Sequence, residues 1–115
     1  MANQKCNIAT AWAKGAKIAP RKAQLVADQI RGMNVVQALA ILENTRRTAN
    51  PIVQKVLQSA IANAVEKDKS INPDGLVITE ARVDQGRMLK RLRARAMGRG
   101  MLVRKKTSHI RLSVG

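Results

Sequence analysis

Aromatic residues are almost absent from this chain of 115 residues, which has no tyrosine, no phenylalanine and a single tryptophan, Trp12. RNA-recognition motifs and oligonucleotide-binding barrels stack bases on several aromatic side chains. The composition therefore argues against both classes. Trp12 itself is expected to pack in the core or at the edge of a sheet.

Cysteine is equally scarce. Cys6 alone cannot form an internal disulfide or a zinc site, which is typical of a protein from a reducing compartment. No apolar run approaches the ~18 residues of a membrane span, and residues 1–5 lack the apolar stretch of a secretory signal. We therefore expect a cytoplasmic protein without a membrane partner.

Signals of catalysis are missing as well. The 7 acidic residues are scattered, and the one histidine, His109, has no carboxylate at a spacing that indicates acid–base chemistry. Ser108 lacks the glycine-flanked turn of a serine nucleophile, and no glycine-rich nucleotide-binding loop occurs. These absences predict a protein that is not an enzyme and that needs no metal and no cofactor.

Positive charge is abundant and unevenly distributed. The formal net charge is +15, of which residues 1–31 carry +5, residues 32–81 carry none and residues 82–115 carry +10. Such a terminal segment repels itself unless a polyanion neutralises it, and nucleic acid is the commonest such partner. A membrane surface would require a basic amphipathic helix with an apolar face, which the basic end lacks. We expect charge and shape, and not stacked bases, to hold the nucleic acid.

The first half of the chain predicts one strand followed by helices. Residues 7–18 alternate loosely, as in a strand. A helix follows from Pro20, with an apolar stripe that includes Leu25 and with Gly32 just beyond its end. A second helix begins after Asn34, whose side chain can cap it.

A third helix has the clearest periodicity in the sequence. Apolar residues recur at i, i+1, i+4 and i+5 over residues 52–65, which predicts a buried helix. Pro51 suits its first turn, and Asn50 is expected to cap it. The three helices together can cover one face of a sheet.

The second half of the chain predicts a hairpin. After a turn at residues 72–75, we expect a strand over 76–84, with the odd-numbered side chains from 77 to 83 on one side, and a final strand over 109–114. Residues 85–104 hold seven basic residues, three glycines and no repeating apolar face. This segment predicts a hairpin that projects roughly 30 Å, at ~3.3 Å per residue. Because it has no core of its own, a surrounding polyanion must order it.

Several strings of the sequence occur in a distinctive order over residues 8–114. They are Pro20-Arg21-Lys22-Ala23, Leu25-Val26-Ala27-Asp28, Ile30-Arg31-Gly32, Ala38-Leu39-Ala40-Ile41-Leu42, Ser59-Ala60-Ile61-Ala62-Asn63-Ala64, Val83-Asp84-Gln85-Gly86, Leu89-Lys90-Arg91, Arg93-Ala94-Arg95-Ala96 and Arg104-Lys105-Lys106-Thr107-Ser108-His109-Ile110. In this order and spacing they resemble the bacterial large-subunit ribosomal protein family L-twenty-two.

The resemblance implies an α+β fold, in which three helices pack on a small antiparallel three-stranded sheet and a long basic β-hairpin extends from the body. It implies one domain over residues 1–115, with the body at about 7–84 and 105–115 and the hairpin at about 85–104. The implied function is that of a structural constituent of the large ribosomal subunit, in the cytoplasm or in an organelle. Its implied partners are large-subunit rRNA, whose assembly it supports, neighbouring ribosomal proteins, and the nascent peptide in the exit tunnel that its hairpin lines.

By the same resemblance, the hairpin tip that faces the tunnel lies at residues 86–91. Its members are Arg87, Met88, Leu89, Lys90 and Arg91. The residues predicted to bind rRNA are Lys14, Lys17, Arg21, Lys22, Arg82, Arg87, Lys90, Arg91, Arg93, Arg95, Arg99, Arg104, Lys105, Lys106 and His109. The sequence departs from the family at Ala94, where proline is common, and at Met97, where arginine is common.

Two other functions compete with this one. Architectural DNA-binding proteins are also small, basic and equipped with arms, but such arms usually end in an apolar wedge or a proline, unlike Lys90-Arg91. An RNA-processing enzyme would need a converging acid and base or a metal cluster, which the spacing of the acids does not supply. We therefore expect rRNA, and not DNA, to be the partner.

Overall fold

A computed structural model describes residues 8–94 and 96–115. The helices are α1 (Pro20–Ile30), α2 (Val35–Asn44) and α3 (Asn50–Lys67). The strands are β1 (Ala9–Ala16), β2 (Ile78–Gln85), β3 (Leu89–Ala94), β4 (Gly100–Lys105) and β5 (Ser108–Val114). Two short 3₁₀ turns, Pro73–Gly75 and Ala96–Gly98, complete the described elements. The predicted α+β class, with helices, an antiparallel sheet and a hairpin, is confirmed.

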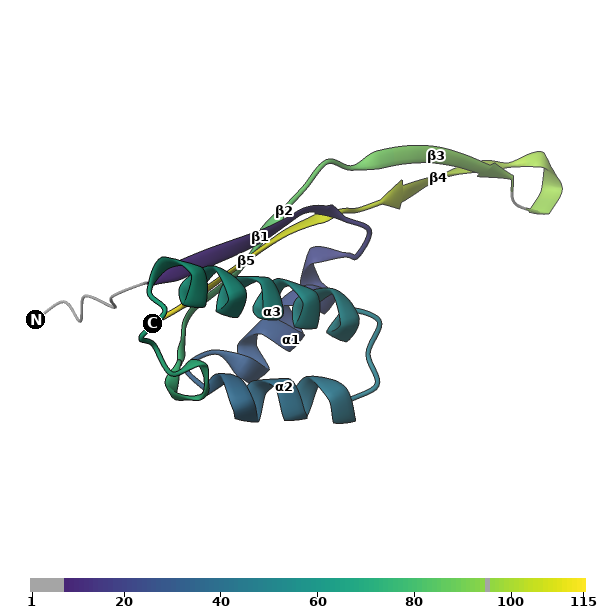
Figure 1. The fold of residues 1–115 in the computed structure, drawn as a ribbon. Coiled ribbons are helices and arrows are strands. Elements are labelled where there is room, and N and C mark those ends of the chain that lie inside the picture. Colours follow the sequence, from purple (N-terminus) through teal and green to yellow (C-terminus); the bar gives the residue numbers. More distant parts are fainter. Residues whose placement is uncertain (1–7, 95) are drawn as a thin grey trace, which may run out of the picture.

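The three-stranded sheet has the order β1-β5-β2, and both of its pairings are antiparallel. All three helices lie on one side of this sheet (Figure 1). We call the side that they cover the inner face and the opposite side the outer face. No described element lies over the outer face (Figure 1).

The core lies between the inner face and the helices. Ile110, Leu112 and Val114 of β5 are fully buried, as their predicted alternation requires. Leu57 of α3 and Ile30 of α1 are also fully buried. Each such side chain contributes roughly 1.5–3 kcal/mol through burial, so the sheet and helices depend on one another for stability. No helix in the described part of the chain is long and apolar enough to cross a bilayer.

The buried stripe of α1 differs in one position from the prediction. Leu25 is 49% exposed, although it was expected in the apolar stripe. The buried residues are Ala23, Val26, Ala27 and Ile30, at i, i+3, i+4 and i+7. Two small residues, Ala23 and Ala27, thus occupy the side of α1 that packs on the sheet. The larger Leu25 lies outside this contact.

Two of the predicted helix caps, Asn34 and Gly32, are found in the structure, and a third, Asn50, is not. Asn34 caps α2 by accepting a hydrogen bond of 2.9 Å from the N–H two residues on. Gly32 has a φ of 80° just beyond α1, where a left-handed residue ends the helix. The predicted cap at Asn50 is wrong, because Asn50 is the first residue of α3. Its buried side chain instead donates to the carbonyl of Leu42, 3.3 Å away, and so ties α3 to α2.

A bulge in β2 changes which of its side chains face the core. The register against β5 shifts between Ile78 and Glu80. The inward side chains are therefore Ile78 and Ala81, three residues apart, and Val77 is 37% exposed. The prediction that the odd-numbered side chains from 77 to 83 share one side is wrong at Val77, since a bulge adds one residue and reverses the alternation.

The hairpin consists of β3 and β4, which pair from Leu89 with Lys105 to Ala94 with Gly100. It projects beyond the helices (Figure 1), and the molecule measures 64 × 29 × 29 Å. Each paired arm has 6 residues, which corresponds to about 20 Å of strand at ~3.3 Å per residue.

The position of the hairpin tip differs from the one that the resemblance implied. The turn lies at Ala96–Gly98, at the far end of β3 and β4 (Figure 1). Residues 86–91 lie at the base of the hairpin, because Leu89 pairs with Lys105 beside the body. The placement of the tip at Arg87, Met88, Leu89, Lys90 and Arg91 is therefore wrong.

Candidate nucleic-acid interface

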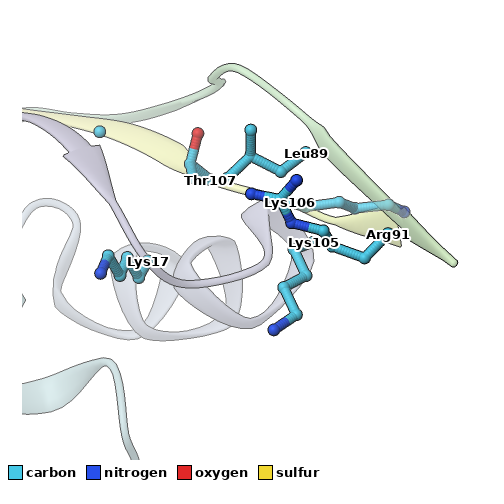
Figure 2. A pocket seen from close by; sticks show the side chains of 7 residues that line it. Lys17, Leu89, Arg91, Lys105, Lys106 and Thr107 are labelled. Carbon is cyan, nitrogen blue, oxygen red and sulfur yellow. The ribbon is translucent and has the colours of Figure 1, made fainter. Parts of the chain in front are cut away.

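A groove of about 470 Å³ opens where the hairpin leaves the body. We call it the junction groove. Its lining residues are Gly15, Lys17, Leu89, Arg91, Lys105, Lys106 and Thr107. Figure 2 shows Lys17 on the segment between β1 and α1, and the other labelled side chains on the hairpin and its base. Folding thus joins cations that are 88 residues apart between Lys17 and Lys105.

Two hydrogen bonds join the two chain segments that form the base of the hairpin. The N–H of Gly86 donates to the carbonyl of Thr107 at 2.8 Å, and the hydroxyl of Thr107 donates to the carbonyl of Arg87 at 2.6 Å. A Cβ at Gly86 would lie 2.6 Å from the Thr107 Oγ1 atom and 3.2 Å from its backbone. The close approach of the two strands therefore requires glycine at this position.

The register of strand pairing also shifts by one residue between the β2–β5 pair and the β3–β4 pair. An extra residue of this kind bends a strand and increases its twist. The shift and the close contact at Gly86 both lie where the hairpin leaves the body.

The cations of the junction groove have no acidic partners within the described chain. Lys17, Arg91, Lys105 and Lys106 are all exposed, and the two ion pairs found among the described residues lie elsewhere. Like charges gathered in one groove repel one another and create a positive potential that attracts anions. The groove is therefore suited to a phosphate backbone, which carries one negative charge per nucleotide.

Neither face of the hairpin has an apolar core. Paired residues share a face, so Leu92 and Leu102 lie on one face, and Arg93 and Met101 lie on the other. Every residue of β3 is exposed, and Leu92 is exposed by 78%. A two-stranded ribbon of this kind is marginally stable in water by itself. A surrounding partner that covers both faces would therefore order it.

The turn at the end of the hairpin presents an uncharged side chain. Met97 has a φ of 63° and is exposed by 95%. A non-glycine residue with this backbone conformation is uncommon outside tight turns. The following residue, Gly98, has a φ of 69°. The chain therefore reverses direction within a very short segment, and Met97 lies at the end of the projection.

A second, smaller pocket of about 270 Å³ lies at the start of α1. Ile18, Lys22, Arg47, Thr48 and Ala49 line it. The first turn of α1 has no acidic residue and no side-chain cap, so the positive end of the helix dipole adds to the charge of the two cations. Arg47 could not be predicted from the sequence, because it lies in the neutral middle of the chain and only the α2–α3 connection brings it to Lys22.

The predicted rRNA-binding residues lie on the body and on the hairpin. Those on the body are Lys14, Lys17, Arg21, Lys22, Arg82 and His109. Those on the hairpin and its base are Arg87, Lys90, Arg91, Arg93, Arg99, Arg104, Lys105 and Lys106. Arg95 lies outside the described residues. Of the others only His109 is not exposed but half-buried. Its Nδ1 atom accepts a hydrogen bond of 3.0 Å from the N–H of Gly15.

The outer face of the sheet holds two residues that sequence reasoning misjudged. Trp12, which was expected to pack in the core or at an edge, lies on edge strand β1 but is 50% exposed. Arg111, which was not among the predicted binding residues, lies beside it on β5. The alternation of β1 with buried Ala11 could have placed Trp12 on the outer face.

Comparison with known proteins places this arrangement in a family. The profile of the ribosomal protein L22p/L17e family matches residues 11–115. The chain belongs to this family. Among L22p/L17e relatives, the large ribosomal subunit protein uL22 of Oceanobacillus iheyensis is 54% identical over 106 residues, which cover 92% of this chain and 93% of that protein. The prediction of a ribosomal protein that is not an enzyme is confirmed by this membership.

Proposed function

We propose that the chain is a structural constituent of the large ribosomal subunit that binds large-subunit rRNA and supports its assembly. The observation that carries the proposal is the junction groove, in which four cations have no ion pair within the described chain. The groove continues into a hairpin without a core. Membership of the L22p/L17e family and the close relative named as a large-subunit protein support the ribosomal setting.

The rRNA contacts lie on both faces of the hairpin. Lys90 and Arg104 pair on one face, and Arg91 and Arg93 lie on the other. Guanidinium groups bind phosphate oxygens through two parallel hydrogen bonds, whereas lysines act as point charges. RNA on both sides of the ribbon therefore neutralises its charge and covers its exposed apolar side chains.

The hairpin tip lines the peptide exit tunnel beside the nascent peptide, and the residues that do so are Ala96–Gly98. The elongated shape supports this part of the proposal, because the molecule is 64 Å long and only 29 Å across. A two-stranded ribbon can pass between rRNA helices where the wider body cannot. The body then lies beside neighbouring ribosomal proteins, in a cytoplasmic ribosome and without a DNA partner.

A tethered probe tests the position of the tip. An iron–EDTA group is attached at Met97→Cys in a chain that carries Cys6→Ser, and large subunits are reconstituted with it. Hydroxyl radicals from position 97 are expected to cleave rRNA of the tunnel wall. A matched probe at Lys69→Cys, on the body beyond α3, is expected to cleave different rRNA near the subunit surface.

The outcomes separate the two parts of the proposal. Cleavage from position 97 that is confined to surface rRNA would contradict the tunnel assignment and leave rRNA binding intact. Equal affinity of the free chain for large-subunit rRNA and for random duplex DNA would contradict the rRNA proposal and favour an architectural DNA-binding protein. The affinities are compared by filter binding over a series of salt concentrations.

A further inference from the structure

The outer face of the sheet carries a row of large side chains that crosses all three strands. Trp12 of β1 pairs with Arg111 of β5, and Arg111 pairs with Arg82 of β2. The residues on either side of Arg111 are buried in the core, so the row points away from the helices. The junction groove and the hairpin do not include these three residues.

Two cations lie against the Trp12 ring without covering it. The Cζ atom of Arg111 is 4.9 Å from the ring centroid, and the Nζ atom of Lys14 is 5.6 Å from it. These distances are within the range of cation–π attraction. Trp12 nevertheless has 50% of its surface exposed, which leaves area for a flat ligand to stack.

The charges beside the ring have no acidic partner in the described chain. Arg82 pairs with Asp84 at 3.1 Å, but neither Arg111 nor Lys14 forms an ion pair among the described residues. The Nε atom of Arg111 is buried and has no hydrogen-bond partner there. Contact with the ring therefore positions the guanidinium of Arg111, and its outer nitrogens are available to an anion.

We propose that Trp12, Arg111 and Lys14 bind one unpaired nucleotide of large-subunit rRNA, with the base stacked on Trp12 and a phosphate on the two cations. The inference rests on the proposed rRNA binding and adds a base-stacking contact to it. A nucleotide fits because it combines a flat aromatic face with an anion. An acidic peptide supplies the anion but leaves the exposed ring unused.

The position of this cluster supports the same partner. Gly15 lines the junction groove and follows Lys14 directly in β1. Its N–H also bonds to His109, on the same outer face. The two surfaces are therefore contiguous, and one RNA segment can contact both. The expectation that charge and shape alone hold the nucleic acid is revised at this one aromatic residue.

The experiment uses Trp12 as its own reporter, because the chain has no other tryptophan and no tyrosine. Full-length protein is titrated with transcribed large-subunit rRNA while tryptophan emission and its quenching by acrylamide are measured. Stacking is expected to reduce both. Trp12→Ala is expected to weaken rRNA binding by about 5- to 150-fold, the range for loss of one stacked base. Trp12→Phe should restore most of the affinity and Trp12→Leu should not.

Leu25→Ala is the matched control, since Leu25 is 49% exposed on the helical side of the body. It should leave rRNA affinity unchanged. Circular dichroism checks that each variant folds, and the emission of the unmodified protein tests the inference independently of any variant.

Each alternative result identifies what fails. The stacking inference is overturned if the unmodified protein binds rRNA tightly without a change in tryptophan emission and Trp12→Ala binds with the same affinity. The proposed function would still stand. Absence of rRNA binding by the unmodified protein overturns both. Impaired incorporation of Trp12→Ala into assembled subunits, with unchanged affinity of this variant for rRNA alone, assigns the outer face to a protein neighbour and overturns the nucleotide assignment. Full affinity of Trp12→Leu also overturns stacking.

Discussion

Removal of charge from the junction groove should change the salt dependence of rRNA binding more than removal of equal charge elsewhere. The groove variant combines Lys17→Gln, Lys105→Gln and Lys106→Gln and lowers the formal net charge from +15 to +12. Glutamine retains most of the length and polarity of each side chain. All three lysines are exposed, so we expect the fold to be unaffected.

The magnitude follows from counterion release. Each cation that neutralises a phosphate contributes about 0.7 to 0.9 to the slope of log affinity against log salt. Three lost contacts should therefore make the slope less steep by about 2 to 3. Between 50 and 200 mM salt, the unmodified protein should lose about 15- to 40-fold more affinity than the groove variant loses.

The control variant carries the same change in net charge at positions distant from the groove. It combines Arg46→Gln, Lys55→Gln and Lys69→Gln, all of which are exposed and none of which lines either pocket. Filter binding to large-subunit rRNA over the salt series gives both slopes. If the two variants show the same slope, general charge and not the junction groove attracts the RNA, and the reasoning from local geometry is refuted.

Two further substitutions test local geometry. Gly86→Ala places a Cβ 2.6 Å from the Thr107 Oγ1 atom, so it should redirect the hairpin and lower rRNA affinity, whereas Gly75→Ala meets nothing within 4 Å and should not; equal affinities of the two variants would contradict the tight junction. Asn34→Ala removes the cap whose oxygen accepts from Val36 and should lower the free energy of unfolding by about 1 kcal/mol. Urea denaturation measures the effect, and Asn34→Ser should retain most of the stability.

The sequence predicted elements well wherever burial imposes a strict period. The apolar pattern of residues 52–65 lies within α3, and the alternation from Ile110 to Val114 matches the buried side of β5. In both cases one face must avoid water, so the spacing of apolar residues reveals the element. The caps of α2 and α1 could also be predicted, because each depends on a residue next to the helix end. Asn34 accepts a hydrogen bond at the start of α2, and Gly32 adopts a left-handed conformation after α1.

The prediction failed where geometry depends on a partner strand. Val77 is exposed because a bulge against β5 shifts the register of β2, and residues 86–91 lie at the hairpin base because Leu89 pairs with Lys105. Neither pairing can be derived from the spacing of residues within one strand. Arg47 was overlooked for a similar reason, since only the packing of α2 and α3 brings it to α1.

The sequence by itself determined the family, the concentration of positive charge at the two ends and the class of fold, because these follow from composition, periodicity and local strings. The tertiary structure alone decided that the hairpin turns at Ala96–Gly98, that Lys17 meets Lys105 in one groove, and that Trp12 lies beside Arg111 on an open face. Each of these features joins segments that are distant in the chain, and their contact depends on strand register and packing.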